Sequence, residues 1–127
     1  MNQTTRAGLK RWSLFLIIAV VVGGFCFAAQ PPKNQIIFYY GEECPHCHNV
    51  LKFIADNQID QKIKIETKEV YHQTQNQREL TALAKICPEI IDSSGNIGVP
   101  VALITREKKC LQGDTAIIEK IKTIMLQ

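Results

Sequence analysis

The sequence after residue 29 lacks an excess of charge of either sign. Residues 30–127 hold 12 Lys and Arg against 12 Asp and Glu, so the formal net charge of +3 comes entirely from the N-terminal flank. A protein that binds nucleic acid through its phosphates needs a basic surface. The composition of residues 30–127 therefore gives no electrostatic reason to expect a nucleic-acid partner.

Methionine, histidine and closely paired cysteines are also scarce. The string Cys44-Pro45-His46-Cys47-His48 matches the attachment pattern of c-type haem, but a cytochrome commonly needs a second axial Met or His and a helical fold. The remaining candidates are Met1, Met125 and His72. A structural zinc site usually takes its four ligands as two close pairs, and the sequence has no second Cys-x-x-Cys. Redox chemistry explains the string better than haem or zinc.

The Cys-x-x-Cys motif follows residues 36–40, an apolar run whose aromatic and branched side chains predict a buried strand. Pro45 suits the first turn of a helix, where its missing N–H is not needed. Cys44 would then lie at a helix N-terminus, where free N–H groups and the helix dipole favour a thiolate. Cys47 is placed to attack a mixed disulfide on Cys44. The spacing thus supplies an attacking thiol and a resolving thiol.

The N-terminal segment predicts export. Residues 12–29 form an apolar run of 18 residues, three basic residues precede it, and no acidic residue occurs before Glu42. A basic flank before an apolar run leaves the flank in the cytoplasm and directs the rest outward. We expect a cytoplasmic flank over 1–11, a transmembrane anchor over 12–29, a linker over 30–35 and an extracytoplasmic domain over 36–127. A cleaved signal peptide is the alternative reading of residues 12–29, because 18 residues lie between the usual lengths of the two segments.

Five cysteines in a short exported chain fit an oxidising compartment. Cys26 lies in the apolar run, and Cys44 and Cys47 form the motif. Cys87 and Cys110 remain, either as a structural disulfide or as two buried free thiols. Sequence alone does not show whether they are close enough to bond, so both alternatives stay open.

Hydrophobic periodicity and turn residues predict an α/β domain with elements in the order βαβαββα. The expected strands cover 36–40, 63–68, 101–105 and 108–111. The first expected helix covers 45–57. A capping box at Asn76 and Glu79 predicts the start of the second helix, which Pro88 ends, and the third helix follows Gly113-Asp114. A helix connects the first two strands, so they must be parallel, whereas the last two can form a hairpin. The expected sheet is four-stranded and mixed, with helices on both faces.

The chain resembles the thioredoxin-fold superfamily, and in length and element order its glutaredoxin branch. Three motifs carry the resemblance: the Cys-x-x-Cys after the first strand, Gly98-Val99-Pro100 before the third strand, and Gly113-Asp114 before the last helix. The second resembles the family's cis-proline loop and the third part of the glutaredoxin glycine–aspartate signature. The resemblance implies a cis bond between Val99 and Pro100, with Pro100 lying against Cys44 and this loop presenting its backbone to the substrate chain.

The sequence departs from the glutaredoxin pattern beside the motif. Glutaredoxins usually carry a basic residue shortly before the first cysteine, which helps to hold glutathione, whereas this chain has Glu42 and Glu43. Glutathione use therefore stays open. The Pro-His dipeptide instead resembles that of periplasmic disulfide oxidases. His46 is placed to stabilise the Cys44 thiolate, which would make the disulfide more oxidising.

We expect an exported, membrane-anchored thiol–disulfide oxidoreductase that acts as a monomer on protein thiols and disulfides. Cys44 attacks, Cys47 resolves, Pro45 starts the helix, His46 tunes Cys44, and Val99 with Pro100 positions the partner chain. No separate cofactor is required, since the dithiol is the redox group. The alternative is a metal chaperone, for which copper(I) would suit a two-thiolate site, or a redox-inactive adaptor. Whether the enzyme oxidises, reduces or isomerises stays open.

Overall fold

The computed structural model describes residues 35–127, in which no helix is both long and apolar enough to cross a bilayer. The predicted flank, membrane segment and residues 30–34 of the linker lie outside the described residues. The elements are β1 (Gln35–Tyr40), α2 (Pro45–Asp56), the 3₁₀ turn η1 (Ile59–Gln61), β2 (Lys64–Glu69), α3 (Thr74–Leu83), the 3₁₀ turn η2 (Pro88–Ile90), β3 (Val101–Ile104), β4 (Lys109–Gln112) and α4 (Asp114–Met125).

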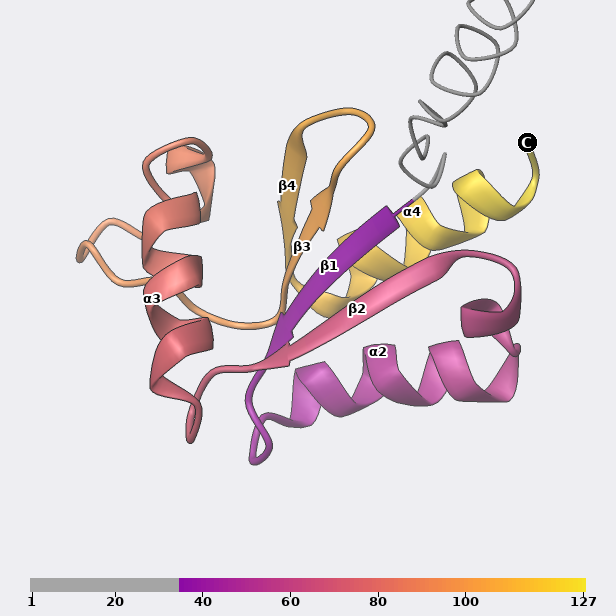
Figure 1. The fold of residues 1–127 in the computed structure, drawn as a ribbon, viewed down its shortest axis with the longest axis horizontal. Helices are drawn as coiled ribbons and strands as arrows, with labels where there is room; N and C mark the ends of the chain where they lie inside the picture. Colours follow the sequence, from indigo (N-terminus) through magenta and orange to yellow (C-terminus); the bar gives the residue numbers. More distant parts are fainter. Residues whose placement is uncertain (1–34) are drawn as a thin grey trace, which may run out of the picture. The chain divides into compact units, whose positions relative to one another are not determined.

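The four strands form one mixed sheet in the order β2-β1-β3-β4. β1 pairs in parallel with β2 and antiparallel with β3, and β3 and β4 form an antiparallel hairpin. The predicted sheet is thus confirmed, with β2 and β4 as its outer strands (Figure 1). β1 is central, and Cys44 follows it after a short turn, so the Cys-x-x-Cys motif leaves the middle of the sheet.

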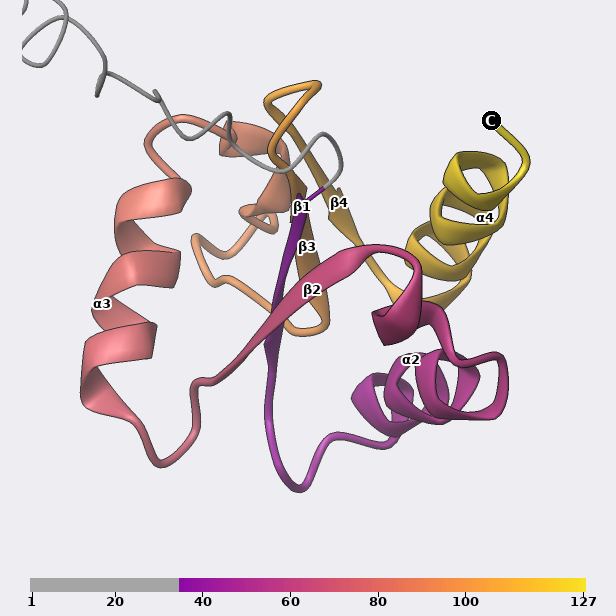
Figure 2. The same ribbon diagram turned by 45° about the vertical axis from the view of Figure 1, so that its right-hand side comes forward.

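Helices cover both faces of the sheet, α2 and α4 on one and α3 on the other (Figure 2). β1 alternates between two cores: Ile36 and Phe38 pack among buried residues of α2 and α4, whereas Tyr39 packs among residues of α3 and β4. Successive side chains of a strand point to opposite faces, so a strand with apolar residues at every position must be covered on both. This double burial fixes β1, from which the motif extends.

The predicted capping box of α3 is wrong. The helix begins at Thr74 with Gln73 as its N-cap, and Asn76 Nδ2 instead donates to the Glu69 carbonyl at 2.8 Å. Glu79 pairs with Lys68 of β2 rather than with its own helix start. The reason is Glu69, whose carboxylate accepts the backbone N–H groups of residues 71, 72 and 73. That carboxylate organises the turn, and the helix starts directly after it.

A disulfide joins Cys87 and Cys110, which decides between the two alternatives left open by the sequence. Their Cα atoms are 6.0 Å apart, within the ordinary range for a disulfide. Both residues are buried in the α3-side core. The bond ties the segment after α3 to β4 and so encloses the loop that carries Val99 and Pro100.

Candidate active site

Cys44 is the N-cap of α2. Its backbone is extended, with φ −89° and ψ 110°, as expected for a residue that precedes a proline. The Cys44 Sγ accepts the backbone N–H of Cys47 at 3.2 Å, and Pro45 occupies the first helical position. The sulfur therefore sits where the free N–H groups and the dipole of the helix favour negative charge. A thiolate released at Cys44 would gain from both.

Cys44 and Cys47 are joined as a disulfide with their Cα atoms 5.2 Å apart. Cys44 is 7% exposed, whereas Cys47 is fully buried beneath the first turn of α2. An incoming thiol therefore has access to the Cys44 sulfur and not to the Cys47 sulfur. The attacking role of Cys44 and the resolving role of Cys47 stay predictions, and both require the more exposed sulfur to be that of Cys44.

The loop before β3 lies against Cys44. The Val99–Pro100 peptide bond is cis, as the resemblance implies, and the Cys44 Sγ lies 3.7 Å from the Val99 carbonyl oxygen. Val99 is half-buried and Pro100 is buried. The structure thus brings together Cys44, Cys47, Pro45, Val99 and Pro100, all of which were predicted as site residues.

Gln112, at the end of β4, holds this loop in place and was missed by the sequence analysis. Its Nε2 donates to the Gly98 carbonyl at 2.8 Å and to the Ile90 carbonyl at 3.3 Å. Beside it, the Gly113 N–H donates to the Pro100 carbonyl at 3.0 Å. No local signal marks an exposed glutamine as a loop anchor, because its partners are 14 and 22 residues away in sequence.

Replacing Gln112 with methionine, which has a similar shape but no donor, is expected to loosen the Val99–Pro100 loop. Unfolding free energy should fall by about 1 kcal/mol, as for a typical hydrogen bond. The loop is predicted to position a partner chain, so the KM for a protein disulfide substrate should rise more than kcat falls. Chemical denaturation and steady-state kinetics measure the two effects. Gln61→Met is the matched control, and an equal effect of both variants would contradict the anchoring role.

His46 contacts α4 rather than Cys44. Its Nδ1 donates to the Asp114 Oδ2 at 3.0 Å, and Asn49 Nδ2 donates to the same oxygen at 2.7 Å. These hydrogen bonds, from Asn49 first and then from His46, hold the pKa of Asp114 well below its usual range. Asp114 also lies in the first turn of α4, where a carboxylate is favoured by the dipole. The His46 imidazole is 72% exposed, so it remains within reach of a bound partner.

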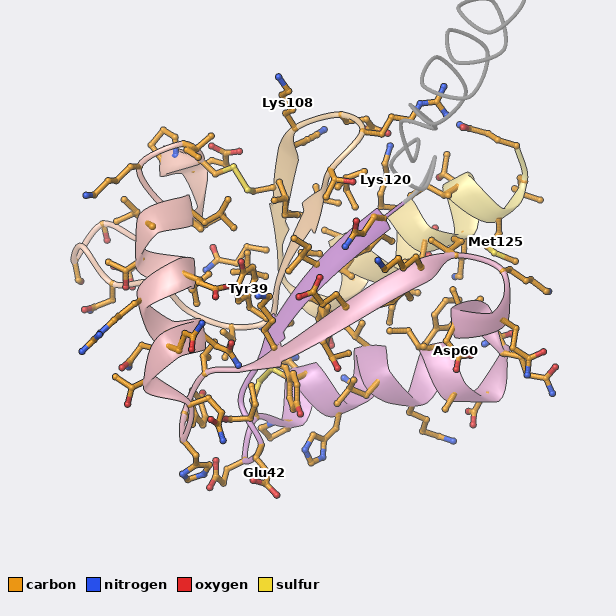
Figure 3. The ribbon with its side chains drawn as sticks, viewed as in Figure 1. Tyr39, Glu42, Asp60, Lys108, Lys120 and Met125 are labelled. Atoms are coloured by element: carbon orange, nitrogen blue, oxygen red, sulfur yellow. A yellow bond between two sulfur atoms is a disulfide. The ribbon has the colours of Figure 1, made fainter. Side chains whose placement is uncertain are left out.

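Acidic residues surround the motif on the β2 side. Glu43 Oε1 accepts from His72 Nε2 at 2.7 Å, and this carboxylate raises the pKa of His72. The Glu42 carbonyl accepts from His48 Nε2 at 2.6 Å, and the exposed Glu42 side chain extends from the turn before α2 (Figure 3). The pKa of Glu69 is lowered because its hydrogen bonds from backbone N–H groups outweigh its partial desolvation. The turn before Cys44 is thus tied to the turn before α3.

A groove runs beside Val99, between α3 and the loop that precedes β3. It is lined by residues that include Val70, Tyr71, Leu80, Ile97 and Val99. The Tyr71 ring packs over Gly41, where a Cβ atom would collide with it, so a side chain at position 41 would displace the ring. Tyr71 remains 54% exposed and offers an aromatic surface at the end of the groove nearest Cys44. An extended segment that crosses Val99 would meet this surface.

Within residues 35–127, metal binding has one geometric candidate away from the motif. Ligand atoms of Cys87, Glu89 and Cys110 lie within 4.8 Å of one another. Both sulfurs are bonded to each other, so they are not available as thiolate ligands in this structure. The dithiol that could bind a metal is therefore Cys44 with Cys47, in its reduced form.

Together these features define a thioredoxin-like α/β fold, with a four-stranded mixed sheet, three α-helices within residues 35–127 and a Cys-x-x-Cys pair at a helix start. No family model and no curated protein matches the chain. Among solved structures it is similar to the glutaredoxin from Methanosarcina mazei Go1, with a TM-score of 0.48 and 15% identity over 70% of this chain and 79% of that chain.

Proposed function

We propose that this protein is a thiol–disulfide oxidoreductase that exchanges disulfides with protein thiols through Cys44 and Cys47. The thioredoxin-like fold and the Cys-x-x-Cys pair support thiol–disulfide redox chemistry. The observation that carries the proposal is the Cys44 sulfur, which caps α2, is the more exposed of the pair and faces the Val99 carbonyl. These three properties suit a nucleophile that meets a polypeptide partner.

The proposed exchange has two steps. A partner thiolate attacks the Cys44 Sγ, the Cys44–Cys47 bond breaks, and Cys47 leaves as a thiolate, which gives a mixed disulfide on Cys44. A second thiolate of the partner then attacks the partner sulfur of the mixed disulfide and releases the Cys44 thiolate. The partner is oxidised to a disulfide, and the protein is reduced to a dithiol by the same two electrons. The reverse sequence reduces a partner disulfide.

Several residues of the site support these steps. The Cys47 N–H hydrogen bond and the start of α2 stabilise the Cys44 thiolate as it leaves, and Pro45 fixes the first turn of α2. Val99 and Pro100 position the partner chain across the groove, and backbone contacts there would accept partners of varied sequence. The exposed partner disulfide or thiol would then approach the Cys44 sulfur in line with the Cys44–Cys47 bond.

Measuring the reduction potential of the Cys44–Cys47 pair tests the function most directly. We expect a reversible two-electron transition in glutathione redox buffers, together with catalysis of either insulin reduction or oxidation of a reduced protein substrate. A potential near that of strong periplasmic oxidants would assign an oxidase, and one near thioredoxin a reductase. Tight copper(I) binding by the dithiol without catalysis of either reaction would contradict the proposal and favour the metal chaperone.

His46 is expected to make the pair more oxidising. His46→Ala should raise the Cys44 pKa and lower the reduction potential, by about 30 mV if the thiolate loses about 1.4 kcal/mol of stabilisation. Activity should fall without vanishing, because the helix dipole and the Cys47 N–H remain. Asp114→Asn serves as the comparison, since it removes the negative charge beside His46 while leaving the imidazole. If the reduction potential of the His46→Ala variant is unchanged, His46 links α2 to α4 and does not tune Cys44.

Export and membrane anchoring are part of the proposal. The apolar run over 12–29 behind a basic flank supports them, and so does the buried Cys87–Cys110 disulfide, because structural disulfides persist in oxidising compartments. The redox domain would then meet secreted protein thiols as they emerge and a redox partner in or at the same membrane. The anchor would keep residues 1–11 in the cytoplasm.

Reporter fusions after Gln127 test this topology. An alkaline phosphatase fusion, which works only outside the cytoplasm, should be active, and a fluorescent reporter that matures only inside should be dark. Moving the charge of Arg6, Lys10 and Arg11 to the other end of the apolar run should reduce the phosphatase signal. The opposite pattern with the parent sequence would place the domain in the cytoplasm.

A further inference from the structure

The end of the sheet at which the chain enters the described domain is basic. β1 begins there with Gln35, β2 begins there, and the turn between β3 and β4 lies there, since β3 runs antiparallel to β1. Five basic residues on these segments form no ion pair with another described residue: Lys62, Lys64, Arg106, Lys108 and Lys109. All five are exposed. We call this surface the basic pole.

Acidic residues at this end are mostly neutralised. Glu107 pairs with Lys120 at 2.6 Å, Glu119 pairs with Lys122 at 2.7 Å, and Asp56 pairs with Lys52 at 2.7 Å. Glu66, whose Oε2 accepts from Gln35 Nε2 at 3.1 Å, shares Lys68 with Glu79. Asp60 on the adjoining η1 turn and Glu89 beside Cys110 form no ion pair with another described residue, and Figure 3 labels Asp60 together with Lys108 and Lys120. The basic pole therefore presents a net positive charge.

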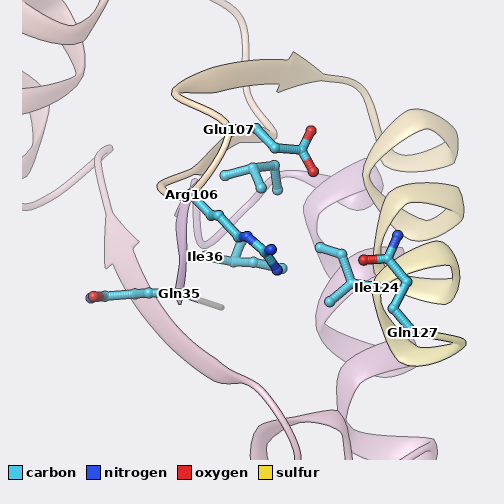
Figure 4. Close-up of a pocket in the computed structure, with 7 residues that line it drawn as sticks. Gln35, Ile36, Arg106, Glu107, Ile124 and Gln127 are labelled. Atoms are coloured by element: carbon cyan, nitrogen blue, oxygen red, sulfur yellow. The ribbon is translucent and has the colours of Figure 1, made fainter. Parts of the chain in front are cut away.

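Apolar side chains accompany the charge. Leu126, just after α4, is 88% exposed, and it lines a shallow hollow with Phe53, Ile59 and Met125, with Lys62 and Lys122 at its rim. A second hollow lies on the other side of the last turn of α4, between Gln35, Arg106, Ile124 and Gln127 (Figure 4). Leu126 is the exposed apolar side chain of these hollows, and an exposed apolar group beside unpaired cationic side chains is found on surfaces that lie against anionic lipid.

The opposite end of β1 has the opposite charge. The segments around Cys44, which are 41–48, 69–73 and 113–114, carry the carboxylates of Glu42, Glu43, Glu69 and Asp114 and no lysine or arginine. β1 has six residues between the two ends, which separates them by about 17–20 Å at the rise of an extended strand. The domain is therefore polarised along β1, basic at Gln35 and acidic at Cys44.

We propose that the basic pole docks onto an anionic lipid surface and holds Cys44 away from that surface. This inference rests on the proposed membrane attachment, because the six residue steps from Ala29 to Gln35 reach at most about 21 Å. A tether this short keeps Gln35 near the bilayer, and the pole that surrounds Gln35 is the one with the complementary charge. Acidic residues at the far end would be repelled by the same lipids. The site would then face partners in the compartment rather than the membrane.

Lysine footprinting of the full chain tests this orientation. One full-length chain is inserted in each nanodisc, and the discs are made of phosphatidylcholine alone or mixed with phosphatidylglycerol. The lysine side chains are then acylated with an uncharged reagent. Reaction at Lys62, Lys64, Lys108 and Lys109 should slow in the anionic discs, by about fivefold for each side chain held at the surface. Lys52, on the exposed side of α2 and paired with Asp56, and Lys85, which follows α3, lie outside the segments that define the basic pole; they are the internal controls and should react equally in both discs.

Two further measurements keep the test decisive. In about 1 M salt, where the screening length is about 3 Å, the protection should disappear without any substitution. A Lys62→Gln/Arg106→Gln/Lys109→Gln variant should also lose protection at Lys64 and Lys108, while exchanging disulfides with a soluble substrate as the parent does.

Equal lysine reactivity in neutral and anionic discs would overturn the inference. Protection that is absent with one chain in each disc and appears only with two would also overturn it. In either case the proposed function stands if the chain stays in the discs and still exchanges disulfides. A chain that washes out of the discs overturns the membrane attachment and the docking together, whereas the exchange assay judges the redox function separately.

Discussion

Replacing Cys44 with serine is expected to reduce disulfide exchange to the rate of the uncatalysed reaction. A serine hydroxyl is not ionised at neutral pH and does not form a disulfide, so neither direction of exchange can begin. Replacing Cys47 with serine should instead leave Cys44 able to attack, with no thiol to resolve the product. Mixed disulfides between Cys44 and partner proteins should then accumulate, and mass spectrometry of non-reduced samples should identify the bond.

The two variants give opposite results if the assignment is correct, which makes the pair sharper than either variant alone. Lys52→Gln, on the exposed side of α2, is the matched control and should exchange disulfides at the parent rate. Trapped complexes on Cys47 in the Cys44→Ser variant would reverse the two roles, against the buried position of Cys47. Substantial turnover by Cys44→Ser would refute the mechanism.

Removing the second disulfide should cause the largest loss of stability. The Cys87–Cys110 bond closes a loop with a sequence separation of 23, for which the chain-entropy model gives about 3 kcal/mol. A Cys87→Ala/Cys110→Ala variant should unfold at a Tm lower by roughly 12–20 °C in a domain of this size. Urea denaturation and calorimetry measure the change, and the disulfide exchange rate below the transition should fall far less than in the Cys44→Ser variant.

Reduction provides the matching comparison for the same bond. Adding a strong reductant to the parent protein should lower its unfolding free energy, and adding it to the double alanine variant should lower it much less. The Cys44–Cys47 bond spans a short loop of sequence separation 3, so its reduction accounts for a smaller share. A parent protein whose stability does not change on reduction would show that Cys87 and Cys110 remain free thiols.

The element order could be predicted from the sequence because it depends on local patterns. The apolar run of residues 36–40, the proline after Cys44 and the alternation of residues 63–68 each act within a few residues. Cys44 at the start of α2 followed directly from such a pattern. The resemblance, and not periodicity, supplied the cis bond at Val99–Pro100, since a proline alone favours the trans form.

Features that depend on distant residues were not predictable. His46 meets Asp114 across 68 residues, and Gln112 reaches back 14 and 22 residues to hold the loop before β3. The pairing of Cys87 with Cys110 depends on how η2, which Cys87 precedes, packs against β4, and no spacing rule gives this packing. The prediction of a capping box at Asn76 and Glu79 was wrong for a related reason. Glu69 of β2 supplies the acceptor for the turn, so the pattern at Asn76 and Glu79 was free for other contacts.

The outer strands of the sheet have a consequence for chains crowded in the plane of a membrane. Among the described strands, β2 has a partner on one side alone, so one row of its backbone groups has no strand partner there, and such an edge can pair with the same edge of a neighbouring molecule. The β2 sequence Lys-Ile-Glu-Thr-Lys-Glu places four charged side chains in six residues, and β4 is only four residues long. A charged edge and a short edge both disfavour strand pairing between molecules. Many copies anchored as proposed could therefore share one membrane at high density without polymerising through their sheets.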